Sequence, residues 1–345
     1  MKNFGITKNG QESHLIEITN GSDIKLVVSD YGATIVSIFV KDKTDREKDV
    51  VLGYDSVSDY EDQRSYFGAT IGRNANRIAH AACELDGAHY DLEKNDNGNN
   101  LHNGKNGFHC AVWEVKEITS DKVIFAYTSK DMEQDLPGNM QATVTYKVTK
   151  ENEICIDYGA VSDKTTVANF TNHAYFNLNG HESGSIENHR LTLYADAYTP
   201  VVDAKSIPTG EIAPVFNTPM DFTKEKCVGQ EIEADFTQLK YAGGYDHNFV
   251  LAKEHGTMKK AAKVIGDISG ITMELFTDCP GIQFYTGNFV KRQEGKEKVF
   301  YDFRHGLCLE PQYYPNAIND KHFLSPVLEA NEQYTSHIKL LFHSK

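Results

Sequence analysis

Positive charge, paired cysteines and long apolar runs are all scarce in this chain of 345 residues. Lys and Arg together number 35 against 49 Asp and Glu, which leaves a formal charge of −14. This excess of acid repels the phosphates of nucleic acids and anionic membranes, so we expect neither as a partner. No segment approaches the roughly 18 consecutive apolar residues of a membrane span, and the first residues lack the apolar core of a secretory signal. We therefore predict a cytoplasmic protein.

Motifs that hold metals or nucleotides are also missing. The cysteines form no C-x-x-C pair, and neither an H-E-x-x-H motif nor a calcium loop occurs. The segment 72–78 lacks the glycines of a dinucleotide fingerprint or a P-loop. We predict that the chain has no metal site and that its thiols are small buried groups. These thiols are Cys83, Cys110, Cys155, Cys227, Cys279 and Cys308.

Helical periodicity is scarce as well, and the two-residue alternation of β-strands replaces it. In 142–148, for example, apolar and polar residues alternate strictly, which is typical of a strand with one buried face. Strands are expected over 122–127, 142–148, 153–158, 271–275 and 334–340. No alternation of strands with helices indicates a parallel sheet. The sequence therefore predicts an all-β fold, a large antiparallel β-sandwich.

The length fits either two ordinary domains or one large β domain. The best helix candidate, 56–62 with Ser56 as its cap, is too short to define a domain. The segments 104–107 and 200–219 carry Gly or Pro, but both are short and flanked by strand-like sequence. We predict a single domain over 1–345.

The segment 171–177 (TNHAYFN) carries polar and aromatic side chains in a strand-like pattern. Alternation predicts that His173, Tyr175 and Asn177 share one face of that strand. An imidazole, a phenol and an amide on one face suit a ligand that has many hydroxyls. The alternative is an ordinary buried histidine that pairs with its neighbours.

Glu310 closes a short apolar run and precedes Pro311. Proline should end the strand there or place it at a sheet edge, so we expect Glu310 at a strand terminus. Apolar neighbours would raise the pKa of this carboxyl by desolvation, as in many catalytic acids and bases. The alternative is a solvent-facing acid at a strand end.

Four weaker candidate residues lie in three polar segments. Asp246 follows a pair of glycines and is either a ligand-binding acid or a turn acceptor. His102 lies in the turn-rich segment 95–107. Asn76 and Arg77 belong to 72–78, where two arginines at a surface would be ordinary.

Seven blocks, in order along nearly the whole chain, resemble the aldose 1-epimerase (galactose mutarotase) family. They are GRNANRI (72–78), NLHNG (100–104), TNHAYFNLNG (171–180), IPTGEIAPV (207–215), YDHNF (245–249), PGIQFYTGNF (280–289) and CLEPQ (308–312). The resemblance implies a large antiparallel β-sandwich with a sugar cleft and no cofactor. It also implies an enzyme that interconverts the α and β anomers of a free hexose such as galactose or glucose. Separately, we expect a monomer or weak homodimer.

The resemblance assigns roles to residues. Glu310 matches the general base that takes the proton of the anomeric hydroxyl, and His173 matches the general acid that protonates the ring oxygen. Opening a cyclic hemiacetal needs both transfers together, which explains a paired base and acid. The residues that match substrate-binding positions are Asn76, Arg77, His102, Tyr175, Asp246 and Gln283.

Two other classes of protein stay open from the sequence. A glycoside hydrolase would use Glu310 and Asp246 as its two carboxylates. A non-catalytic carbohydrate-binding protein would need no acid–base pair. A phosphorylated hexose is a weaker candidate substrate, because no cluster of basic residues stands out.

Two positions depart from the family pattern. Asn103 and Gly104 stand where the family commonly has a glycine pair, and Pro311 stands where it often has Thr. Asn accepts a left-handed backbone less freely than Gly does, so the loop after His102 could differ. We expect these departures to affect substrate preference more than reaction type.

Overall fold

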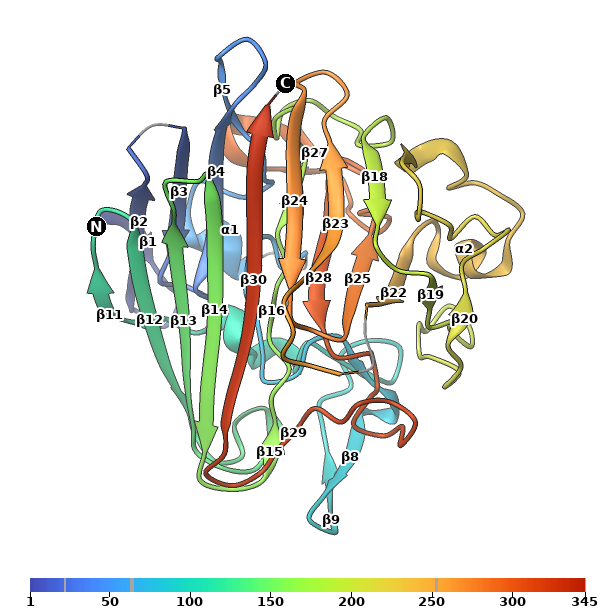
Figure 1. The fold of residues 1–345 in the computed structure, drawn as a ribbon. Coiled ribbons are helices and arrows are strands. Elements are labelled where there is room, and N and C mark those ends of the chain that lie inside the picture. Colours follow the sequence, from blue (N-terminus) through green and yellow to red (C-terminus); the bar gives the residue numbers. More distant parts are fainter. Residues whose placement is uncertain (22, 63–64, 252–253, 345) are drawn as a thin grey trace.

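A computed structural model gives the structure of the protein and describes residues 1–21, 23–62, 65–251 and 254–344. Three antiparallel sheets, of nine, six and five strands, make up most of it. The nine-stranded sheet crosses the front of Figure 1. Its strands, in spatial order, are β11 (Glu114–Ile118), β12 (Lys122–Ser129), β13 (Met140–Val148), β14 (Glu153–Ser162), β30 (Gln333–Ser344), β24 (Ile271–Thr277), β23 (Lys259–Ile265), β18 (Arg190–Leu193) and β21 (Lys226–Cys227). All five predicted strands lie in this sheet, so those predictions are confirmed.

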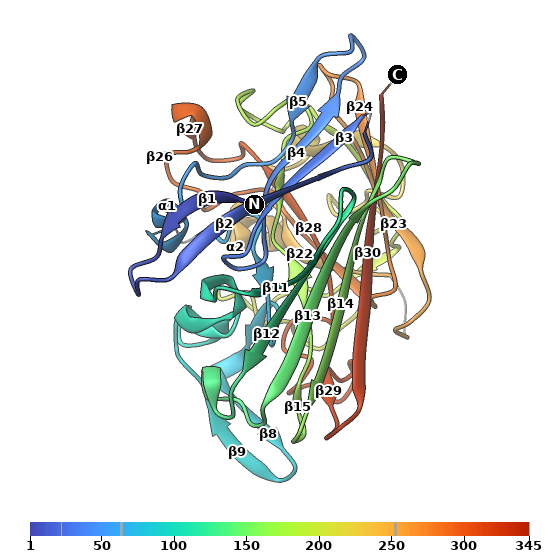
Figure 2. The ribbon, with the colours of Figure 1, turned by 90° about the vertical axis from the view of Figure 1, so that its left-hand side faces the viewer.

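The other two sheets lie behind the nine-stranded sheet, as the views of Figures 1 and 2 show together. The five-stranded sheet contains β1 (Lys2–Ile6), β2 (Glu12–Thr19), β3 (Ile24–Ser29), β4 (Thr34–Lys41) and β5 (Glu47–Asp49). The six-stranded sheet, in spatial order, contains β17 (Tyr175–Phe176), β28 (Leu307–Gln312), β25 (Gly281–Tyr285), β22 (Asp246–Val250), β19 (Ala197–Tyr198) and β20 (Ala213–Pro214). The predicted antiparallel β-sandwich is confirmed.

One hydrophobic cluster fills the space between these layers. It draws buried side chains from Ile16 near one end of the chain to Phe342 near the other. The alternation in β13 places Val144 and Tyr146 in this core, while Thr143 on the other face is exposed. A core shared by both ends of the chain favours the predicted single domain.

Short elements complete the structure. Two-stranded pairs are formed by β6 (Thr70–Ile71) with β16 (Thr171–Asn172), β7 (Arg77–Ile78) with β10 (Asn100–Leu101), β8 (Ala82–Leu85) with β9 (Ala88–Asp91), β15 (Thr166–Val167) with β29 (Val327–Leu328), and β26 (Gln293–Glu294) with β27 (Phe300–Tyr301). The helical elements are α1 (Val57–Asp62), α2 (Thr237–Ala242) and the 3₁₀ turns η1 (Ala79–Ala81), η2 (Gly104–Asn106), η3 (Phe108–Cys110), η4 (Glu133–Asp135), η5 (Val228–Gln230) and η6 (Lys296–Lys298). None of the described helices is long and apolar enough to cross a membrane.

The predicted helix cap is confirmed, whereas the prediction for the cysteines is only partly right. The backbone N–H of Asp59 donates to Oγ of Ser56 at 3.3 Å, which caps α1. All six thiols are free, but Cys110 is exposed, and Cys155 and Cys227 are only half-buried. Cys110 lies at the end of η3 on the wall of a surface cavity, and its thiol donates to the carbonyl of Lys105 at 3.1 Å.

Candidate active site

A cavity of about 380 Å³ opens beside the six-stranded sheet, and all eight predicted site residues line it. They are Asn76, Arg77, His102, His173, Tyr175, Asp246, Gln283 and Glu310. These residues come from positions spread over more than half of the chain, so only the fold brings them together.

Three neighbouring strands supply one wall. Glu310 on β28 pairs in register with Gln283 on β25, and β25 pairs in turn with β22, which begins at Asp246. The Nε2 of Gln283 donates to Oδ1 of Asp246 at 2.7 Å. This bond fixes the amide orientation and leaves Oε1 of Gln283 without a partner among the described residues. Asp246 therefore belongs to a strand and not to a turn.

The predicted position of Glu310 at a strand terminus is wrong. β28 continues through Pro311 to Gln312, and Pro311 pairs in register with Ile282. The strand tolerates proline because β17, on its other side, pairs only with Leu307 and Cys308. Glu310 is 2% exposed, so the solvent-facing alternative is also wrong.

His173 lies in a break between β16 and β17, so 171–177 is not the continuous strand that alternation predicted. Its backbone N–H donates to the carbonyl of Ala69 at 2.9 Å, which anchors the break. The imidazole stacks on Tyr175, with ring centroids 5.1 Å apart, and its Nε2 lies 3.7 Å from Oε2 of Glu310. The predicted base and acid are therefore neighbours in the cavity.

Asn177 does not share that face, contrary to the prediction. Its Nδ2 donates to the carbonyls of Gly184 and His305 at 2.8 and 2.9 Å, and it does not line the cavity. β17 ends at Phe176, so the alternation stops before Asn177, whose side chain braces two loops instead.

The loop histidine has a defined tautomer. The backbone N–H of Asn76 donates to Nδ1 of His102 at 3.1 Å, so a neutral His102 must carry its proton on Nε2. Burial holds the pKa of His102 well below its usual range, and the neighbouring His173 and Arg77 lower it further. His102 is therefore a neutral hydrogen-bond donor on the cavity wall.

The two arginines of 72–78 have different positions. Arg77 donates from Nε to Oδ2 of Asp96 at 2.8 Å, and its side chain is 11% exposed on the cavity wall. Arg73 is completely buried, and its guanidinium donates to Ser129 Oγ and to the carbonyl of Gly138. The interpretation of both as ordinary surface arginines is therefore wrong, because Arg73 is buried and ties together the two ends of the segment 129–138.

Burial is the largest influence on the pKa values of Glu310 and His173. It raises the pKa of Glu310 well above its usual range, and the nearby Asp246 adds to the rise while Arg77 opposes it. Burial also lowers the pKa of His173 to about 3 and raises the pKa of Asp246. The predicted desolvation of Glu310 is thus confirmed, and before a ligand binds burial favours the uncharged carboxyl of Glu310 and the neutral imidazole of His173.

Buried polar atoms without partners mark where a ligand fits. Among the described residues, Oε2 of Glu310 and Oε1 of Gln283 are both buried and accept no hydrogen bond. Such atoms are rare in folded proteins, and two of them on residues that line one cavity favour acceptors for the hydroxyls of a ligand. His102, His173 and Glu310 each also offer one ligand atom within 4.8 Å of the others, so the absence of a metal here stays a prediction.

Several wall residues were missed from the sequence. They are Tyr66, Asp96, Tyr241, Tyr285 and Phe289. Tyr285 and Phe289 lie inside the block 280–289, which was a usable signal. Tyr66 packs against both His102 and His173, with ring centroids 4.8 and 5.7 Å away, but no motif marked it.

Comparisons with known proteins agree with this architecture. The sequence model of the aldose 1-epimerase family matches residues 14–341. A galactose mutarotase of Sus scrofa is 40% identical over 312 residues, which cover 90% of this chain and 89% of that protein. An aldose 1-epimerase of Escherichia coli (strain K12) is 35% identical over 333 residues, covering 96% of this chain and 95% of that protein.

Solved structures of epimerases have the same fold as this chain. An aldose epimerase homologue from C. elegans superposes with a TM-score of 0.87 at 30% identity, covering 96% of this chain and 99% of that one. A galactose 1-epimerase from Lactobacillus acidophilus NCFM superposes with a TM-score of 0.85 at 27% identity, covering 99% and 97%. The resemblance found in the sequence is confirmed, and the chain belongs to the aldose 1-epimerase family of isomerases.

Proposed function

We propose that this protein interconverts the α and β anomers of a free hexose such as galactose or glucose, with Glu310 as general base and His173 as general acid. The observation that carries the proposal is the distance of 3.7 Å between Nε2 of His173 and Oε2 of Glu310 inside a buried cavity. Two groups this close can act on the two oxygens bonded to one anomeric carbon.

Ring opening needs two proton transfers. The carboxylate of Glu310 takes the proton from O1 while His173 gives a proton to the ring oxygen, so the bond between C1 and the ring oxygen breaks and an aldehyde forms. Rotation about C1–C2 exposes the other face of the aldehyde. Reclosure reverses both transfers and restores the pair, so no net proton is consumed.

Substrate binding has to move the proton of the Glu310 carboxyl to the imidazole of His173. Burial favours the uncharged carboxyl before the sugar binds, whereas the positive charge of Arg77 favours the carboxylate. The O1 hydroxyl of a bound sugar adds a donor to the unpartnered Oε2 of Glu310 and favours the carboxylate further. His102, with its proton on Nε2, supports the substrate as a neutral donor.

An uncharged sugar fits the cavity better than a sugar phosphate. Within the described part of the chain, Arg77 is the only Lys or Arg on the cavity wall, and it is paired with Asp96. Asp96, Asp246 and Glu310 bring three carboxyl groups to the same wall. A carboxylate repels the negative charge of a phosphate, and carboxyl oxygens accept hydrogen bonds from sugar hydroxyls. We further propose that the protein is cytoplasmic. We also propose that it is a monomer or weak homodimer, which light scattering can check.

Polarimetry tests the proposal. Freshly dissolved α-D-galactose and α-D-glucose should lose their excess rotation faster with the native protein, and Glu310→Gln and His173→Asn should each abolish the acceleration. A glycoside hydrolase using Glu310 and Asp246 would keep most of its activity in His173→Asn, and a pure binder would accelerate nothing. No acceleration with either free sugar would overturn the proposal.

A further inference from the structure

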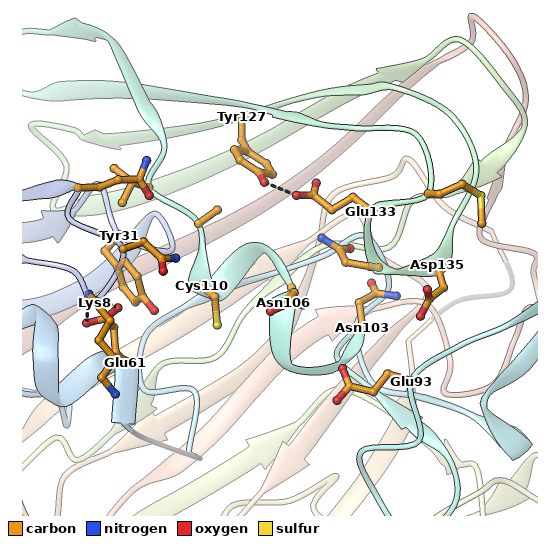
Figure 3. A pocket seen from close by; sticks show the side chains of 17 residues that line it. Lys8, Tyr31, Glu61, Glu93, Asn103, Asn106, Cys110, Tyr127, Glu133 and Asp135 are labelled. Carbon is orange, nitrogen blue, oxygen red and sulfur yellow. Dashed lines mark hydrogen bonds between the residues drawn. The ribbon is translucent and has the colours of Figure 1, made fainter.

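A second and larger cavity, of about 720 Å³, lies on the other side of the loop that carries His102. Figure 3 shows Lys8, Tyr31 and Glu61 on one side of it and Asn103, Glu93 and Asp135 on the other. Asn103 directly follows His102, so one loop separates this cavity from the active site.

Two amide side chains on the wall are fixed in orientation by the backbone beneath them. The N–H of Arg73 donates to Oε1 of Gln134 at 3.3 Å, and the N–H of Asn74 donates to Oδ1 of Asn103. Each amide oxygen accepts a hydrogen bond from a backbone N–H, so the NH₂ group of each amide points away from that donor. In the described part of the chain, Nδ2 of Asn103 and Nε2 of Gln134 are buried without a partner.

A carboxylate completes this set of polar groups. Oε1 of Glu133 accepts from the hydroxyl of Tyr127 at 2.6 Å, as the dashed line in Figure 3 marks. Its Oε2 is buried and has no partner among the described residues. Residues of this wall therefore hold two unused donors and one unused acceptor, as residues of the active-site wall hold unused acceptors.

The charge of the cavity wall limits which ligands can bind. The wall carries four carboxylates, Glu61, Glu93, Glu133 and Asp135, against the single cation Lys8 among the described wall residues. Lys8 is already paired with Asp62. An anion would be repelled, whereas a molecule with several hydroxyls can both accept from the amides and donate to Glu133.

We propose that this cavity is a second, non-catalytic site for a saccharide without negative charge, with Asn103, Gln134 and Glu133 as its polar contacts. Its occupant touches the loop that carries His102 and the segment that leads to Asn76. The binding claim is independent of the proposed catalysis, so the two can fail separately.

Methyl-¹³C methionine NMR tests this inference directly. Met132 lines the cavity and is 51% exposed, whereas Met140 and Met273 are buried in the core and report on folding. Titration with D-galactose should shift the Met132 methyl signal saturably, and galactose 6-phosphate should shift it at least tenfold more weakly. His173→Asn should show the same Met132 shift even if it is inactive.

Two variants provide the controls. Gln134→Ala should lose most of the Met132 shift while its mutarotase activity stays within about twofold of the native value. Asn103→Gly removes the other amide without backbone strain, because the φ of +59° at this position suits glycine, and should weaken the shift as well. Unchanged Met140 and Met273 signals show that each variant is folded. No Met132 shift in the native protein, or an equal shift in Gln134→Ala, would overturn the inference and leave a cavity occupied by water alone.

Discussion

Replacing Glu310 by Gln should make the protein more stable while making it inactive. Glu310 is 2% exposed, its Oε2 has no partner within the described residues, and burial raises the pKa of its carboxyl. Gln has nearly the same shape and never has to carry a charge in this cavity. A shift of one pKa unit corresponds to about 1.4 kcal/mol, and the pKa of Glu310 is raised well above its usual range, so Glu310→Gln should raise the free energy of unfolding at pH 7 by at least about 1 kcal/mol.

The gain in the free energy of unfolding should increase with pH. Because the pKa of Glu310 is raised in the folded state, the folded protein holds this proton more tightly than the unfolded chain does. The contribution to stability is therefore fully present below the ordinary Glu pKa of about 4.3 and is lost as the pH rises through the raised pKa. Native protein and variant should be almost equally stable at the acid end, and the difference should grow with pH and then level off.

Urea unfolding followed by circular dichroism from pH 4 to 8 measures this difference. Glu151→Gln is a matched control, because Glu151 is exposed, and its effect should be small and flat with pH. A Glu310→Gln variant that is less stable than the native protein, or a gain that does not change with pH, would refute the account of a desolvated carboxyl.

Three further predictions follow from the same structure. The pH profile of kcat/KM should show no fall near 6.5, the ordinary pKa of histidine, because burial lowers the pKa of His173 to about 3. Its alkaline limb should lie at the raised pKa of Glu310, above which the carboxyl loses its proton. A limb centred near 6.5 would contradict this. Arg73→Met should lower the free energy of unfolding by about 3 kcal/mol, measured by urea unfolding, because it leaves Ser129 and the carbonyl of Gly138 without their donor. Treatment with a strong chelator should leave the mutarotation rate within about twofold, and a loss that zinc restores would place a metal among the active-site ligands.

The sheets could be predicted because their pattern is local. Alternation in β13 reports directly which side chains face the core, and the same holds for β12, β14, β24 and β30. The position of Glu310 could not be predicted this way. Whether Pro311 ends a strand depends on what lies beside it, and β17 pairs no further along β28 than Cys308 because the strand is interrupted at His173.

The site residues could be named from the sequence, but their chemical state could not. His102 carries its proton on Nε2 because a backbone N–H from Asn76 reaches Nδ1 across 26 positions of sequence. The pKa of His173 falls because the folded protein buries it, which no local motif encodes. The wrong face predicted for Asn177 has a similar origin, because β17 ends at Phe176 and alternation does not apply beyond the end of a strand.

The proximity of Glu310 and His173 is tested most directly by combining their variants. Mutarotation of α-D-galactose should be measured for Glu310→Gln, His173→Asn and the double variant, at one pH and after confirming that each is folded. If the two residues act as one proton-transferring pair, the double variant should be no slower than the slower single variant, because either loss already disables the unit. If the two losses multiply instead, each residue contributes independently, and the paired mechanism is wrong.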